Sequence, residues 1–249
     1  MKILITNDDG ILSQGIAALA NALKLLGEVW LVAPDRERNA ISHALTLHRP
    51  LRISNLSNQH FAINGTPADC VNIGIHYLLQ EKPALVVSGI NKGANLGNDI
   101  NYSGTVGAAV EAALMGIPSF AISLEGEHNF VFEPAAHFAL RLARFILNKG
   151  LPPQTLLNVN VPDTEGQEIN QYLLTRQDTQ ARMNTIEEKT DPRGGRYYWI
   201  GRIHNGVEKE AVNGNSDLEA LRRKVISVTP LTVDRTHSTF FEGSFSCTL

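Results

Sequence analysis

The chain has 249 residues, 43% of them hydrophobic, so it can bury a sizeable core as one large domain or as one domain with an appendage. Its 22 Lys and Arg residues nearly balance 25 Asp and Glu residues, and the formal net charge of −3 argues against a broad surface for nucleic acid or anionic lipid. Cys70 and Cys247 lack metal-ligand spacing, and no apolar run reaches the roughly 18 residues of a membrane span. We expect a reduced, cytoplasmic protein with neither a nucleic-acid polymer nor a membrane as its partner.

Residues 1–150 alternate strand-like and helix-like segments. Strands are expected, in chain order, at 2–6, 28–34, 60–64, 84–90 and 117–124. Helices are expected at 14–26, 67–80, 105–115 and 134–148. Apolar strands separated by helices predict a mostly parallel sheet covered on both faces, which is a Rossmann-like three-layer α/β fold.

From about residue 150 the pattern becomes richer in strands. Strands are expected at 156–162, 172–176 and 224–233. The polar stretch 177–196, with a turn at 191–195, indicates extended hairpins that cover the site or contact another subunit. We therefore divide the chain into a Rossmann-like catalytic core at 1–165 and a β-rich extension with hairpin arms at 166–249.

The first candidate site follows the first strand, where Asp8 and Asp9 stand side by side before Gly10. Adjacent strand residues point to opposite faces, so both carboxylates can serve one ion only if the chain has already turned, which Gly10 permits. Carboxylate oxygens suit Mg²⁺, Mn²⁺ or Ca²⁺. By itself, an Asp-Asp pair is more often a solvated turn than a metal site.

The second candidate site is the Gly- and Asn-rich stretch 88–109, which runs from a buried strand into a helix. Ser103, Gly104 and Thr105 stand where that helix begins, and the exposed N–H groups of a helix start attract anions. The spacing matches neither a Walker A loop nor the GxGxxG fingerprint. By itself, the stretch is equally typical of an ordinary turn with a Ser N-cap.

Electrostatics connects these two elements. Each pair of unit charges about 4 Å apart repels by roughly 4 kcal/mol at an effective dielectric near 20, so two carboxylates would drive away a phosphate monoester. A divalent cation between them removes this conflict. The stretch 33–47 follows another strand end, where Asn39 offers a neutral oxygen ligand and Ser42 or His43 can contact phosphate or substrate.

Five stretches carry a resemblance to the SurE family of stationary-phase survival proteins: ILITNDDGI, VAPDRERNAISHALTL, NGTPADCV, VVSGINKGANLGNDINYSGTVGAAVEA and DPRGGRYYWIG. The resemblance extends from residue 1 to about 237. It implies a divalent-metal-dependent 5′-nucleotidase, with 3′-nucleotides and polyphosphate as further substrates in some members. It also implies that the C-terminal portion is an arm through which subunits pair, giving a homodimer or homotetramer.

The resemblance assigns roles residue by residue. It implies one divalent cation per subunit, Mg²⁺ or Mn²⁺, held by Asp8, Asp9, Asn39 and Asn91. The family usually has Ser at position 39, but an amide oxygen also coordinates a hard cation. It further implies that Asn95, Ser103, Gly104 and Thr105 form the phosphate-side loop.

The leading hypothesis is hydrolysis of nucleoside 5′-monophosphates, with Asp8 or Asp9 as the catalytic base that positions the attacking water. A haloacid-dehalogenase-like phosphatase would need an aspartyl nucleophile at position 7, where Asn7 cannot form the acyl phosphate. Two non-enzymatic alternatives stay open at this point. The chain is then a nucleotide-binding regulatory module without turnover, or its C-terminal arm acts mainly as an assembly surface.

Overall fold

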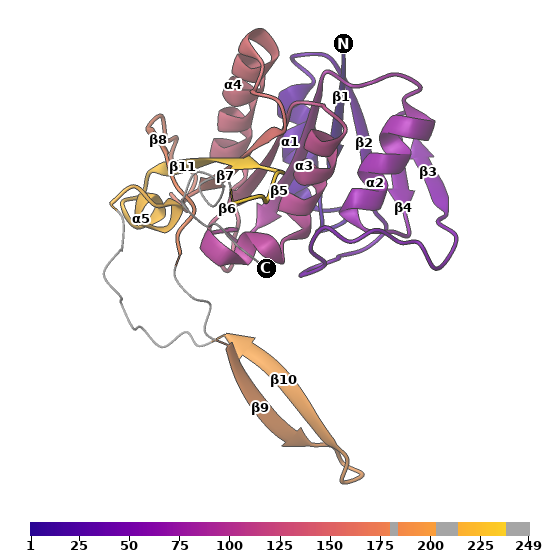
Figure 1. Cartoon of the computed structure of the whole chain (residues 1–249), viewed down its shortest axis with the longest axis vertical. Coiled ribbons are helices and arrows are strands. Elements are labelled where there is room, and N and C mark those ends of the chain that lie inside the picture. The colour runs from indigo at the N-terminus through magenta and orange to yellow at the C-terminus, as the bar shows by residue number, and fades with distance from the viewer. Residues whose placement is uncertain (180–183, 203–213, 238–249) are drawn as a thin grey trace, which may run out of the picture.

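A computed structural model describes residues 1–179, 184–202 and 214–237 (Figure 1). The strands are β1 (Lys2–Thr6), β2 (Glu28–Pro34), β3 (Ile53–Ser57), β4 (His60–Ile63), β5 (Leu85–Lys92), β6 (Ser119–Leu124), β7 (Thr155–Val161), β8 (Tyr172–Leu174), β9 (Asn184–Thr190), β10 (Arg196–Arg202) and β11 (Ile226–Thr232). The α-helices are α1 (Gln14–Leu23), α2 (Pro67–Ile73), α3 (Gly104–Leu114), α4 (Glu133–Lys149) and α5 (Asp217–Arg222). A π-helical turn at Gly74–Leu78 extends α2, and a 3₁₀ segment at Gly97–Asn101 precedes α3.

The main sheet is mostly parallel, which confirms the predicted fold class. Its strand order is β3-β4-β2-β1-β5-β6-β7-β11-β8. The run from β4 to β7 is parallel throughout, while β3 and β11 are antiparallel to their neighbours β4 and β7. The carboxyl ends of the parallel strands therefore meet at one edge of the sheet.

Helices cover both faces of the sheet and bury alternate residues of its strands (Figure 1). Ile3 and Ile5 of β1 pack in the core cluster that contains residues of α1 and α4. Leu4, which points to the opposite face, packs in the cluster that contains residues of α2 and α3. This burial on both sides explains why β1, β5 and β6 read as continuous apolar runs.

The C-terminal part contributes to two sheets. β8 and β11 follow residue 165 and extend the main sheet beyond β7, while β9 and β10 pair only with each other as an antiparallel hairpin. Figure 1 shows this hairpin standing away from the main sheet. The division of the chain into functional units near residue 165 stays a prediction. None of the helices in the described ranges combines the length and apolarity that a bilayer crossing requires.

Several boundaries differ from the sequence-based expectation. α1 ends at Leu23, three residues before its predicted end, and α2 passes into the π-helical turn after Ile73. β3 and α5 were not predicted, because β3 is an exposed edge strand without apolar alternation and α5 has only 6 residues, too few for a helical period to emerge. The hairpin expected around the turn at 191–195 is present as the antiparallel pair β9 and β10.

Candidate active site

The turn after β1 brings Asp8 and Asp9 to the carboxyl edge of the sheet. Asn7 folds this turn: its Nδ2 donates to the Gly10 carbonyl at 3.0 Å, and its Oδ1 accepts from the Gly10 N–H at 3.2 Å. The same Nδ2 donates to Ser13 Oγ at 2.8 Å, and Ser13 caps α1. Gly10 has φ +96°, a conformation that favours glycine. The Asn7 amide therefore has a structural role in forming the turn.

Asp8 is held by the start of α3. Its side chain is only 4% exposed, and it accepts hydrogen bonds from the Thr105 backbone N–H at 3.1 Å and from the Thr105 hydroxyl. A Cβ at Gly104 would lie 3.0 Å from Asp8 Cβ, so glycine permits this close approach. The start of α3 therefore binds the carboxyl group of Asp8, and the phosphate site expected there stays a prediction.

Asp9 is half-buried beside the end of β5, where its Oδ2 accepts from the Lys92 backbone N–H at 3.2 Å. Burial, reinforced by the negative charge of Asp8, raises the pKa of Asp9 to about 6. Burial also raises the pKa of Asp8, although its hydrogen bonds to Thr105 act in the opposite direction. Among the described residues neither carboxylate forms an ion pair, so this pair of acids fits a hard cation between them.

A cavity of about 250 Å³ opens beside these acids and is lined by half of the ten predicted site residues. Five predicted residues line it: Asp8, Asn39, Asn91, Asn95 and Ser103. The further lining residues are Ala40, Lys92, Gly93, Ala94, Asp99 and Tyr102. Sequence reasoning assigned no site role to Lys92 or Asp99, although both lie in the Gly- and Asn-rich stretch that it singled out.

Asn91 and Asn39 supply neutral oxygens. The Asn91 Nδ2 donates to the Gly93 carbonyl at 2.8 Å, and the Asn39 Nδ2 donates to Glu37 Oε1. Both amide nitrogens are thus engaged, which leaves each Oδ1 as a potential ligand. Within the described ranges no three His, Cys, Asp or Glu side chains converge on a possible ion. A cation site here therefore needs these amide oxygens in addition to the two carboxylates.

Asn95 is fixed in the cavity wall by polar residues of β6 and β7. Its backbone N–H donates to Asn160 Oδ1 at 2.8 Å, and its carbonyl accepts from Asn158 Nδ2 at 2.9 Å and Asn160 Nδ2 at 3.0 Å. Its side-chain Nδ2 donates to Ser123 Oγ at 2.8 Å. Ser103 Oγ accepts from the Val106 N–H at 3.1 Å and caps α3, and no residue in the described ranges accepts a hydrogen bond from its hydroxyl, which can therefore turn toward a ligand.

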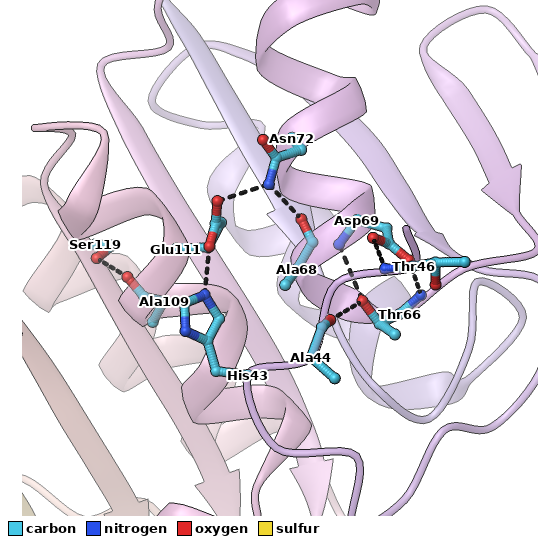
Figure 2. Close-up of polar contacts among 10 residues, drawn as sticks. All are labelled: His43, Ala44, Thr46, Thr66, Ala68, Asp69, Asn72, Ala109, Glu111 and Ser119. Carbon is cyan, nitrogen blue, oxygen red and sulfur yellow. Dashed lines mark hydrogen bonds and ion pairs between the residues drawn. The ribbon is translucent and has the colours of Figure 1, made fainter. Parts of the chain in front are cut away.

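Thr105, Ser42 and His43 occupy different surroundings from those expected. Thr105 is fully buried, and both its N–H and its hydroxyl donate hydrogen bonds to Asp8. Ser42 and His43 line a neighbouring cavity of about 220 Å³, which shares Ser103 with the first. His43 Nε2 pairs with Glu111 of α3 (Figure 2). Phosphate contacts by these three residues stay predictions.

The sequence of the chain matches a family of known proteins. The family model described as "Survival protein SurE" matches residues 3–184. The chain is 53% identical over 238 residues to 5′-nucleotidase SurE of Pelobacter propionicus, covering 95% of each chain. It is also 53% identical over 238 residues to 5′-nucleotidase SurE of Geobacter sulfurreducens, covering 95% of this chain and 90% of that one.

The fold agrees with a solved structure. The crystal structure of the SurE protein from Aquifex aeolicus superposes with a TM-score of 0.86 at 41% identity, covering 97% of each chain. Sequence and fold thus agree over nearly the whole length, and they confirm the resemblance that the motifs carry. The chain belongs to the SurE family.

Proposed function

We propose that this protein is a 5′-nucleotidase, a hydrolase that converts nucleoside 5′-monophosphates to nucleoside and phosphate with the help of a divalent cation. Relatives about 50% identical over nearly the full chain carry the name 5′-nucleotidase SurE. The observation that carries the proposal is the pair of adjacent acids, Asp8 and Asp9, whose pKa values are raised beside a polar cavity. These acids suit a phosphate ester only if a cation lies with them.

The proposed ligands are the carboxylates of Asp8 and Asp9 and the amide oxygens of Asn39 and Asn91. This all-oxygen set suits Mg²⁺ or Mn²⁺. A bound dication would supply positive charge that offsets the two acids and polarises the phosphoryl oxygens. Because Thr105 and Lys92 hydrogen-bond the two carboxylates, the ligands are held in place before the cation arrives.

The phosphate is proposed to approach from the side of Ser103, Asn95 and Lys92. The first turn of α3 already gives the Thr105 N–H to Asp8 and the Val106 N–H to Ser103, so the helix start has few donors left for a second anion. The Ser103 hydroxyl and the Lys92 ammonium then supply the donors for the phosphoryl oxygens. Tyr102 lines the same cavity and offers a face on which a base can stack.

One of the two acids is proposed to orient the attacking water. Asp8 accepts two hydrogen bonds from Thr105, which hold it as a fixed ligand, whereas Asp9 accepts one from Lys92. Asp9 therefore has more freedom to accept a proton. The oxygen that the Lys92 N–H does not engage could accept a hydrogen bond from the attacking water.

The test is release of inorganic phosphate from a panel of nucleoside 5′-monophosphates with Mn²⁺, with Mg²⁺ and after chelation. We expect cation-dependent turnover that the chelator abolishes. Nucleoside 3′-monophosphates and short polyphosphate form further arms of the panel. Nucleotide binding without any phosphate release would instead establish the regulatory binding module, and turnover that survives chelation would contradict the metal site.

We further propose that the β9–β10 hairpin mediates self-association as a homodimer or homotetramer. Its large side chains are exposed: Ile186 is 63%, Tyr198 57%, Trp199 60% and Ile200 74% accessible. Contiguous exposed apolar groups of this kind are typical of a protein–protein contact. Truncation near residue 225 would also remove β11, which lies within the main sheet. Deletion of 184–202 removes the hairpin alone and is therefore the cleaner test. Sedimentation velocity of the deletion variant decides the matter.

A further inference from the structure

The loop that carries Asn39 has an unusual backbone. It leaves β2 after Pro34 and passes the cavity with Ala40 at φ 51° and Ser42 at φ 58°. Both lie in the left-handed region, which residues other than glycine rarely adopt. Such a conformation persists only where surrounding contacts impose it. The position of the Asn39 amide therefore depends on whatever holds this loop.

Hydrogen bonds on either side of Asn39 hold the loop, one to the turn after β1 and two to residues that precede α3. Before Asn39, the Arg38 N–H donates to the Asp8 carbonyl at 2.7 Å. After it, the Ser42 N–H donates to the Tyr102 carbonyl at 2.9 Å, and the Ser42 hydroxyl donates to the Asn101 carbonyl at 2.6 Å. A Cβ at Gly107 would lie only 2.7 Å from the Ser42 carbonyl oxygen, so the loop lies directly against the helix.

His43 adds an ionisable contact between the loop and α3. Figure 2 shows its ring pointing along α3 to Glu111, which also accepts from Asn72 of α2 at 2.6 Å. Glu111 is only 7% exposed. Burial works to raise the pKa of Glu111, but the hydrogen bonds from His43 and Asn72 outweigh it and lower that pKa. A charged, buried carboxylate thus anchors the loop from two helices.

We infer that His43 and Glu111 form a positioning pair that fixes the loop and so holds the Asn39 amide oxygen at the cation site. The inference rests on the proposed function. His43 lies four residues after Asn39 and its Nε2 is engaged by Glu111, so we infer an action through the loop, whereas the phosphate contact expected for His43 from the sequence would instead raise the KM for the nucleotide. The pair should therefore set the affinity for the cation, whereas the rate at saturating cation should change little.

The test measures Mn²⁺ binding to the full chain by isothermal titration calorimetry without nucleotide. His43→Ala should weaken binding by about tenfold, as the loss of an outer partner of a metal ligand typically does. His43→Gln places an amide nitrogen near the original Nε2 and should restore most of the affinity. His137→Ala is the matched control, because it removes an exposed His–Glu pair, Nδ1 to Glu168 Oε1 at 2.6 Å, on α4. It should leave Mn²⁺ binding unchanged.

A double-mutant cycle tests the route through Asn39. If His43 acts by placing Asn39, then His43→Ala should weaken binding no further in an Asn39→Ala background. Additive losses, or a His43→Ala variant that binds Mn²⁺ as wild type does, would overturn the inference. Should His43→Ala fail to fold, Glu111→Gln takes its place in the cycle, since it keeps the side-chain volume and removes the charge.

Enzyme kinetics separates the inference from the proposed function. In His43→Ala the Mn²⁺ concentration for half-maximal phosphate release should rise, while kcat at saturating Mn²⁺ should stay near the wild-type value. A general loss of packing would instead lower kcat and the melting temperature together, and that result would contradict a positioning role. Absence of phosphate release from the wild-type chain would overturn the proposed function, and the calorimetric cycle would still decide the inference.

Discussion

The cavity at the carboxyl edge of the sheet and the β9–β10 hairpin are built in opposite ways. Around the cavity, residues far apart in sequence hold one another: Thr105 binds Asp8, and Asn160 binds Asn95. The hairpin is held by the backbone pairing of β9 with β10 and by exposed ion pairs within these two strands, and Trp199 is 60% exposed. Placement in the cavity therefore depends on the whole fold, whereas the placement of the hairpin side chains depends on β9 and β10 alone.

This difference predicts that substitutions at the two places have separable effects. A change beside the cavity should alter cation affinity or turnover, because each functional group has a buried partner. A change on the hairpin should alter association alone.

Asp8→Asn should lower Mn²⁺-dependent kcat/KM by more than about 100-fold, because it removes the charge of a proposed metal ligand. Loss of a residue that only hydrogen-bonds a metal ligand typically costs roughly 10–100-fold. Because burial disfavours the charged form of Asp8, the free energy of unfolding without cation should not fall in parallel. Steady-state kinetics and urea unfolding measure the two quantities. Asp163→Asn, at an exposed loop position, is the control. Wild-type turnover in Asp8→Asn would show that the cavity is not the reaction site.

Thr105→Val should lower kcat/KM by about tenfold and the free energy of unfolding by about 1–3 kcal/mol. The change removes the hydroxyl that donates to Asp8 but keeps the backbone N–H donor at 3.1 Å. Thr105→Ser retains the hydroxyl and loses only a methyl group, so it should keep most of the activity. Equal activity in the two variants would mean that the hydroxyl does not hold Asp8 for catalysis.

Removal of the cation should make stability depend on pH. The pKa of Asp9 is raised from 3.8 to about 6, so folding favours its protonated form. Its contribution is fully present below the unfolded pKa of 3.8 and is lost as pH rises through 6. Mn²⁺ at 100 times its dissociation constant should add about 2.7 kcal/mol where the acids are ionised. Thermal unfolding at pH 5 and pH 7.5 should show a larger Mn²⁺ shift at the higher pH, and equal shifts would contradict carboxylate ligation.

The parts of the fold and site that were predictable are those with local signals. Continuous apolar runs gave β1, β5 and β6, and the strand ends pointed to Asp8 and Asn91, which line one cavity. Parallel strands bring their carboxyl ends to the same edge whatever the loops do. Because of this constraint, residues that follow different strands could be predicted from the sequence to line the same site.

The remainder depends on contacts that leave no local pattern. Asn158 and Asn160 look like polar interruptions of β7, and only the fold shows that they hold Asn95 from 63 and 65 residues away. Thr105 reads as a helix-start residue with free donors, yet Asp8, 97 residues distant, occupies them. In the same way, the pairing of His43 with Glu111 requires a loop laid along α3. No periodicity or motif encodes these partners.

The smallest effect on turnover is expected at the hairpin. The double change Tyr198→Ser and Trp199→Ser removes two exposed aromatic side chains, one from each face of β10. If these faces form the subunit contact, sedimentation velocity should show a lower mass, while kcat/KM and Mn²⁺ affinity should stay within about twofold of wild type, as is usual for surface substitutions. Tyr77→Ser, which alters a 69% exposed tyrosine beside α2, controls for loss of a surface aromatic. A large loss of turnover in the double variant would mean that the hairpin contributes to the active site, and the separation between the two regions would not hold.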